Sequence, residues 1–326
     1  GGFIVMVIGA LLGWGVGHIA YKTGLSSTVM SRIHGFGKNG SMITAIIFGF
    51  MIIGFIALEN VLLYKGLLFY FGVADSLQMQ ILIYGLLTLS WILLTAFGFG
   101  LVTKVSSWLV VLFLAVLVYI MWGVVGSSSY SVSDVASFTS QLPVEVLTAM
   151  QAATWGDKLA FCVNILIGSA GALALIDGDL GRYARRSKDV AIAAFLGNAF
   201  MDIGMLFIGG AVMYAGMSEL VTYYVSTGMT QEAAQKMALE SPDSVAAAFI
   251  VFGGVLGAIL MLLAQAKAQV LNTYSASLSL TNLMDAARAA KTEKFVFLGW
   301  SIKKIEIVKI NPEFFSDRNP TFTVYL

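Results

Sequence analysis

A carboxylate and an aromatic ring share one helix face in the middle of an apolar stretch. Phe55 and Glu59 lie four residues apart within Met42–Tyr64, so a helix places both on the same side. The ring offers a surface for stacking and the carboxylate accepts N–H donors, which suits a flat, hydrogen-bonding solute. A charge inside hydrocarbon is costly, which makes Glu59 a functional candidate. The alternatives are a core role for Phe55 and a neighbouring-helix partner for Glu59.

A second polar stripe runs along the apolar stretch Val255–Leu280. Gln265, Gln269 and Asn272 follow the spacing i, i+4, i+7, which lines up their amides on one helix face. An amide both donates and accepts, so it can bind the edge of a nucleobase or a cyclic ureide; amide bonds between helices are the alternative. Lys267 points roughly opposite this stripe, either as a fixed cation that contributes to ion coupling or as a residue that snorkels along its stem.

Small residues are concentrated in the middle of the stretch Leu159–Ile176. Its centre reads Gly168-Ser169-Ala170-Gly171. Such a run allows either close helix packing or a mid-membrane break that exposes backbone N–H and C=O groups to a buried solute. Both interpretations stay open.

Three charged residues are weaker candidates for ion coupling or gating. Asp179 and Arg182 are three residues apart and could pair at a gate, although ordinary anchoring by basic residues also explains Arg182. Asp202 could relay protons or make a structural bond. We expect no metal site and no cofactor, because neither histidine has a carboxylate or cysteine at ligand spacing, and no enzyme, because the chain has no Walker, GxSxG or HExxH motif.

The composition requires that a membrane positions these groups. Of 326 residues, 58% are hydrophobic and 11% are charged, against about 25% charged in soluble domains. This excludes a soluble enzyme and disorder, and the net charge of +1 gives no argument for a nucleic-acid partner. The sequence predicts an all-α polytopic membrane protein in contact with a lipid bilayer. We expect about seven spans of roughly 20 residues, at Gly2–Ala20, Met42–Tyr64, Met79–Ala96, Val105–Val125, Leu159–Ile176, Val190–Met213 and Val255–Leu280.

Basic residues predict the orientation of these spans. Eleven lie in alternate loops and two or three in the others, and cationic loops resist translocation. Loops 21–41, 97–104 and 177–189 and the C-terminus are therefore expected in the cytoplasm, in a multi-pass protein of the plasma membrane, the inner membrane in a bacterium. A further span is expected before residue 1 if the N-terminus is cytoplasmic.

The connections predict three more features. The segment Ala215–Asp243 is an expected outer loop, with Thr230 as the N-cap of a short helix. Ser244–Phe252 is expected to form a separate re-entrant or surface helix, set off by Gly253 and Gly254. Residues 1–293 would form the transmembrane domain, and residues 294–326 a divergent tail that is either a cytoplasmic extension or foreign sequence.

Several motifs together resemble the nucleobase:cation symporter family, which includes purine/cytosine permeases and hydantoin and allantoin carriers. The segment Ala20–Ser27 followed by Ser31–Gly37 is similar to the loop after the family's second helix. Asp179-Leu180-Gly181-Arg182-Tyr183 resembles its acidic-x-x-Arg-aromatic motif after the sixth helix. Asn272–Leu283 resembles the end of its eighth helix. The resemblance runs from residue 1 to about residue 290.

The resemblance implies the inverted five-helix-repeat fold, here incomplete, with the spans as helices two to eight of twelve. It implies that the substrate lies between broken helices one and six, against helices three and eight. By position, the stacking aromatic falls on Phe55, the polar position one turn later on Glu59, the helix-six break on Gly168–Gly171 and the helix-eight amide on Gln269. The sequence departs from the family in two respects: Ala170 replaces a second aromatic, and Leu263 and Ala264 replace the hydroxyl residues of sodium-coupled relatives.

These expectations define the functional hypotheses. The first is a secondary active symporter of a nucleobase or a related planar heterocycle, in which Phe55 stacks on the ring, Glu59, Gln269 and Asn272 bond its edge, and Ser169 with nearby backbone completes the pocket. The coupling ion, H⁺ or Na⁺, is undecided, and so is the oligomeric state. The alternatives are a non-transporting sensor or remnant of such a carrier, and a carrier of another small solute. A channel is disfavoured because the polar residues cluster near one mid-membrane point.

Overall fold

The computed structural model describes residues 2–128, 130–131, 133–134, 142–197, 202–241, 243–290, 296–297 and 300–301. The side chains of Ser169, Ala170 and Asp202 lie outside this description. The described chain is almost wholly helical. Its elements are α1 (Gly2–Thr23), α2 (Ser27–Ser31), the π-helix η1 (Arg32–Phe36), α3 (Gly37–Phe71), α4 (Leu77–Ser127), α6 (Val144–Ala149), α7 (Trp155–Gly181), α8 (Ser187–Ala194), α9 (Asp202–Ser226), α10 (Gln231–Glu240), α11 (Asp243–Ala290), β1 (Val296–Phe297) and β2 (Trp300–Ser301).

The described residues contain six helical segments that are long and apolar enough to cross a bilayer. The protein is therefore an all-α polytopic membrane protein, as its composition predicts. The segments are Phe3–Thr23, Ser27–Phe71, Leu77–Phe97, Val110–Ser127, Gly204–Ser226 and Ser244–Ala287. Phe3–Thr23, Leu77–Phe97 and Val110–Ser127 overlap predicted spans closely, whereas Ser27–Phe71 and Ser244–Ala287 contain predicted spans and extend well beyond them. The predicted span Val190–Met213 lies about half a helix before the segment Gly204–Ser226. The predicted span Leu159–Ile176 is helical but is not among the six.

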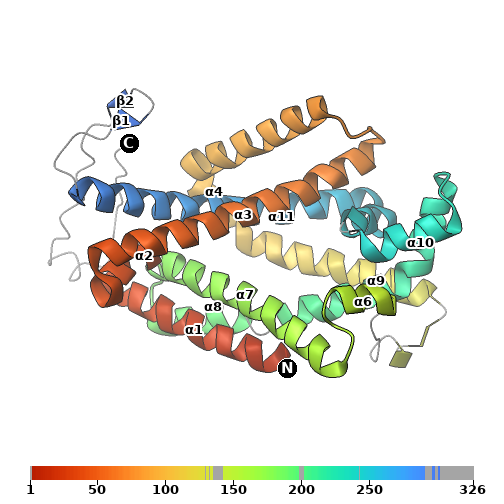
Figure 1. The fold of residues 1–326 in the computed structure, drawn as a ribbon, viewed down its shortest axis with the longest axis horizontal. Coiled ribbons are helices and arrows are strands. Elements are labelled where there is room, and N and C mark those ends of the chain that lie inside the picture. Colours follow the sequence, from red (N-terminus) through yellow and green to blue (C-terminus); the bar gives the residue numbers. More distant parts are fainter. Residues whose placement is uncertain are drawn as a thin grey trace.

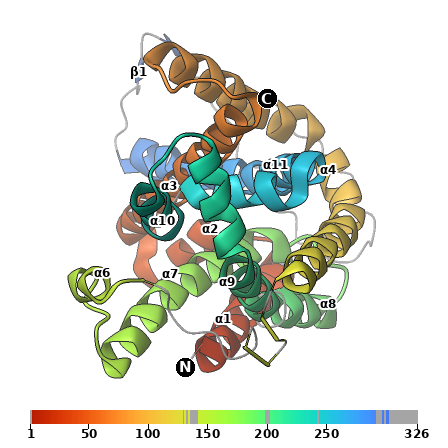
Figure 2. The same ribbon diagram turned by 90° about the vertical axis from the view of Figure 1, so that its right-hand side faces the viewer.

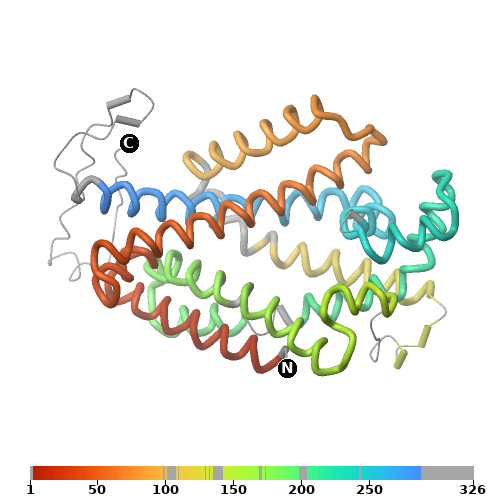
Figure 3. The backbone as a smooth tube through the Cα atoms, viewed as in Figure 1, coloured from red at the N-terminus to blue at the C-terminus, as the bar shows by residue number. Residues whose placement is uncertain are grey.

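Three predicted boundaries are wrong. The loop expected at 97–104 is helical, because α4 continues through it, and this stretch contains no proline to end a helix. The two membrane-length parts of α4 nevertheless occupy different regions of the molecule (Figure 3). The single helix expected at Val190–Met213 is divided between α8, which ends at Ala194, and α9, which extends to Ser226. Much of the expected outer loop from Ala215 is therefore helix.

Two local predictions are confirmed. The side chain of Thr230 accepts a hydrogen bond from the Ala233 N–H at 3.3 Å and caps α10, which satisfies one of the donors that a helix start leaves free. Gly254 has φ 52° and ψ −132° and interrupts α11. A residue with a Cβ adopts this conformation at a cost, so glycine allows the chain to turn between the short segment Ser244–Phe252 and the long helix that follows.

The helices form two groups along the long axis of the molecule (Figure 1). In one, α1 lies against α7 and α8; in the other, α3 lies against α11, with the first part of α4 beside them (Figures 1 and 2). Glycines allow α1 and α7 to approach closely: a Cβ on Gly181 would lie 2.8 Å from the Cα of Gly17. Packing of small residues is the usual means of association between helices in lipid.

One apolar cluster joins the two groups, and another lies within the α3–α11 group. Phe48, Ile52 and Ala276 are buried where α3 meets α11, and Leu175 and Ile176 of α7 pack against them. A second cluster joins α3, α4 and α11 around Leu63 and Trp91. The contact between α3 and α11 therefore carries both polar stripes of the sequence, and the neighbouring helices α4 and α7 pack against it.

Candidate functional site

Glu59 of α3 and Asn272 of α11 meet across the contact between the two helices. The amide Nδ2 of Asn272 donates a hydrogen bond to Oε2 of Glu59 at 3.3 Å. Glu59 is half-buried and Asn272 is buried. Two residues that lie 213 positions apart are thus brought together as neighbours in an apolar region. The carboxylate can still accept further hydrogen bonds, because one amide uses only part of its capacity.

Gln269 is held rigidly one turn from Asn272. Its side chain is 0% exposed, and its Nε2 donates to the Ile56 carbonyl at 3.0 Å and to Oδ1 of Asn60 at 3.1 Å. Its Oε1 is buried and has no hydrogen-bond partner among the described residues. Both N–H bonds of the Gln269 amide therefore donate to α3, and the atom left without a hydrogen bond, Oε1, is an acceptor.

Asn60 and Trp91 complete this network, and the sequence analysis missed both. Oδ1 of Asn60 accepts a second hydrogen bond, from Nε1 of Trp91 at 2.8 Å, and both residues are 5% exposed. The signal for Asn60 was available, because a polar side chain inside an apolar span needs a partner. Trp91 could not be found in this way, since an indole ring is unremarkable in an apolar helix. Through these hydrogen bonds, Asn60 and Trp91 hold the amide of Gln269 against α3 and α4.

Phe55 lies half-buried on the same helix as Glu59, one turn earlier. It packs against the cluster that includes Ile52 of α3 and Ala276 of α11, to which Leu175 and Ile176 of α7 also contribute. Phe55 is therefore at the point where the two helix groups touch. Gln265, the third amide of the stripe, also has a buried and unpartnered Oε1. The unpartnered amide oxygens of Gln265 and Gln269 are acceptors, and solutes that complement them carry N–H donors.

The break predicted at Gly168–Gly171 is wrong. The backbone of α7 is α-helical from Trp155 to Gly181, so its N–H and C=O groups bond within the helix and are not offered to a solute. Added Cβ atoms at Gly168 and Gly171 would meet no atom within 4 Å, so these two glycines are not at a tight helix contact. The side chains of Ser169 and Ala170 lie outside the described residues, and no role for them can be derived.

Asp179 and Arg182 lie in a different place, at the end of α7, and take different partners. Oδ1 of Asp179 accepts a hydrogen bond from the Ser27 N–H at 2.9 Å, and the side chain is 1% exposed. Arg182 donates through Nη2 to the hydroxyls of Tyr183 and Tyr274. The described residues show no ion pair between the two, so the predicted direct pair is not formed. Both residues instead connect α7 to other elements, α2 and α11.

Of the two remaining weak candidates, Lys267 lies away from the Glu59 site. Lys267 lines a cavity on the other side of α11, as its position in the helix predicts. The side chain of Asp202 lies outside the described residues. No group of three or more metal-binding side chains occurs in the described part of the chain.

A second network that sequence analysis missed closes the turn between α3 and α4. Asp75 accepts hydrogen bonds from Tyr64 at 2.6 Å and Gln80 at 2.9 Å, and pairs with Lys65 at 3.0 Å. These interactions, the Tyr64 bond first, hold the pKa of the Asp75 carboxyl well below its ordinary value, because each favours the charged form. This network ties the C-terminal end of α3, the helix that carries Glu59, to the start of α4.

The chain matches no protein-family model, no curated protein and no solved structure.

Proposed function

We propose that the protein is a secondary active transporter of a nucleobase or a related planar heterocycle. The observation that carries this proposal is the polar cluster of Glu59, Gln269 and Asn272 between two apolar helices, with a half-buried aromatic ring one turn away. Buried polar groups in a membrane are costly and mark solute or ion pathways. The resemblance to nucleobase:cation symporters supports the choice of solute.

The unused acceptors specify which groups a solute would present. Glu59 and the Oε1 atoms of Gln265 and Gln269 are acceptors, so the best complement is a ring that carries several N–H donors. Cytosine, adenine, hydantoin and allantoin each carry more than one N–H group, and the ring of Phe55 would stack on the planar ring. Because α7 is continuous, its backbone groups are not available to a solute. The hydrogen-bond donors and acceptors of the site therefore come from α3 and α11.

Alternating access would follow from movement of the α1–α7 group against the α3–α11 group. Phe55 supports this division, because it packs where Leu175 and Ile176 of α7 meet α3. A bound solute shifts such an equilibrium only if it binds the two states with different affinity, and a ring wedged at this contact would do so. We propose H⁺ or Na⁺ as the coupling ion, with Glu59 as the carrier of charge if it is H⁺.

Binding of radiolabelled cytosine, adenine, hydantoin and allantoin to the reconstituted protein tests the proposal. For a solute that binds, we expect Glu59→Gln to weaken affinity at least tenfold, because a hydrogen bond to a charged group is worth about 1.5–3 kcal/mol and 1.4 kcal/mol is tenfold. Glu219→Gln is the matched control, since Glu219 is exposed on α9. Failure of all four solutes to bind, or an equal effect of both substitutions, would refute the proposal.

The uninterrupted α7 favours one second candidate, a sensor that binds the solute without moving it. Carriers with discontinuous helices use the helix ends to hold solutes and ions, and α7 offers none. Uptake into proteoliposomes separates the two functions. Binding with accumulation of solute supports the transporter, and binding with no accumulation under either a proton or a sodium gradient supports the sensor.

A further inference from the structure

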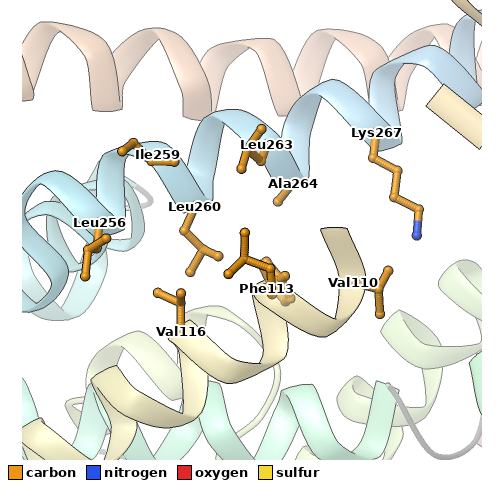
Figure 4. Close-up of a pocket in the computed structure, with 10 residues that line it drawn as sticks. Val110, Phe113, Val116, Leu256, Ile259, Leu260, Leu263, Ala264 and Lys267 are labelled. Carbon is orange, nitrogen blue, oxygen red and sulfur yellow. The ribbon is translucent and has the colours of Figure 1, made fainter. Parts of the chain in front are cut away.

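An elongated cavity of about 250 Å³ lies between the second part of α4 and the long segment of α11. Its walls are formed by apolar side chains from both helices, including Phe113, Val116, Leu256, Leu260 and Leu263 (Figure 4). The helices that form it belong to two of the membrane-length segments. The cavity is therefore a half-open apolar space between two membrane-length helical segments.

Among the described side chains that line this cavity, Lys267 is the only charged one. It lies at one end of the row of apolar side chains (Figure 4). Its ammonium makes no hydrogen bond or ion pair within the described part of the chain, and the side chain is half-buried. An unpaired cation in an apolar region is unfavourable unless an anion compensates it.

The cavity is separate from the site proposed for the heterocycle. Lys267 and Gln269 are two residues apart on α11, which places their side chains on opposite sides of the helix. Gln269 faces Ile56 and Asn60 of α3, whereas Lys267 faces the second part of α4. A ligand in the cavity therefore contacts none of the groups assigned to the heterocycle.

We propose that this cavity binds an apolar monocarboxylate, with the carboxylate paired to Lys267 and the hydrocarbon chain between α4 and α11. One ammonium compensates one negative charge, so a phosphate dianion would leave an uncompensated charge among apolar groups. At about 30 Å³ for each water-sized group, 250 Å³ holds a chain of roughly eight carbon atoms. Burial of each CH₂ contributes about 0.8 kcal/mol, so the chain and the ion pair both favour binding.

Such an acid can arrive from water as a short-chain carboxylate or from the bilayer as a fatty acid. The two sources share the same chemistry and differ in chain length.

Equilibrium binding to the protein in nanodiscs tests the proposal with octanoate, palmitate, octanol and octylamine as probes. We expect saturable binding of octanoate below its micellar concentration, and binding of octanol and octylamine at least tenfold weaker. Binding of octanoate identifies a water-borne acid; binding of palmitate alone identifies a membrane-borne one, and either result supports the site. Failure of both acids, or equal binding of octanoate and octanol, overturns it.

Three variants locate the site. Lys267→Met should weaken octanoate binding at least tenfold and Lys267→Arg should largely preserve it, which separates loss of charge from loss of fold. Ala264→Phe places a ring in the cavity and should abolish binding while Lys267 is intact. Lys22→Met, an exposed lysine on α1, is the matched control. Unchanged binding in Lys267→Met or in Ala264→Phe overturns the proposal. These readouts use no heterocycle, so they are independent of the proposed transport function.

Discussion

Asn60 is the residue through which α3, α4 and α11 share one hydrogen-bond network. Its Oδ1 accepts from Trp91 at 2.8 Å and from Gln269 at 3.1 Å. We predict that Asn60→Leu, which keeps the approximate volume and removes the acceptor, destabilises the protein and loosens Gln269. The indole N–H of Trp91 then has no partner in the described structure, whereas Gln269 retains the Ile56 carbonyl.

The magnitude follows from the two lost bonds. Hydrogen bonds between membrane helices average about 0.6 kcal/mol each and reach about 1.7 kcal/mol, so two of them give about 1–3 kcal/mol. A second estimate of the same loss, the cost of leaving a buried donor without a partner, is also about 1–3 kcal/mol. We therefore expect the free energy of unfolding to fall by about 1–3 kcal/mol.

Unfolding of the full chain in detergent, followed by tryptophan fluorescence, measures this loss. Asn39→Leu is the matched control because Asn39 is exposed on the same helix, and substitutions at such positions usually change stability by less than about 0.5 kcal/mol. A double-mutant cycle with Trp91→Phe should give a coupling free energy near that of one hydrogen bond. Equal effects of Asn60→Leu and Asn39→Leu, or zero coupling with Trp91, would refute the reasoning.

Two further predictions concern the helix ends and the helix contacts. Asp75→Asn should destabilise the α3–α4 turn at neutral pH. Because folding lowers the pKa of Asp75 from its ordinary 3.8, its contribution is present above about pH 4 and is lost as the pH falls through the lower folded-state pKa; unfolding at pH 7 and pH 3 should show the difference between wild type and variant shrinking in acid, and a constant difference would contradict this. Gly181→Ala should cost about 1–3 kcal/mol through overpacking, because its Cβ would lie 2.8 Å from Gly17. Gly168→Ala, which meets no atom within 4 Å, should be neutral or stabilising, and thermal unfolding that ranks the two alike would contradict the close α1–α7 packing.

Local patterns predicted the elements that depend on local chemistry. The composition and the long apolar runs predicted an all-α membrane protein. Thr230 predicted the start of α10, and Gly253-Gly254 predicted the interruption of α11. Each depends on forces that act within a few residues: the capping of free N–H groups, the conformational freedom of glycine, and the length of an apolar segment relative to a bilayer.

The predicted helix boundaries were wrong where a helix and a break or loop have similar local free energies. Gly168–Gly171 is compatible with a break or with a regular helix, and the structure has the helix. The stretch 97–104 contains two glycines and a lysine, which suggested a loop, yet α4 continues through it. Glycine lowers helix propensity by only about 1 kcal/mol, so the packing and backbone hydrogen bonding of the whole chain decide between helix and loop.

The sequence by itself determined that Glu59, Gln269 and Asn272 are polar groups in apolar helices and therefore need partners. It could not determine the partners, because a helical period gives the face of a residue but not which helix lies opposite. The tertiary structure paired Glu59 with Asn272, attached Gln269 to Asn60 of α3, and placed Lys267 at a cavity on the opposite side of α11. These assignments depend on contacts between residues about 200 positions apart, and only the packing of the complete set of helices brings such residues together.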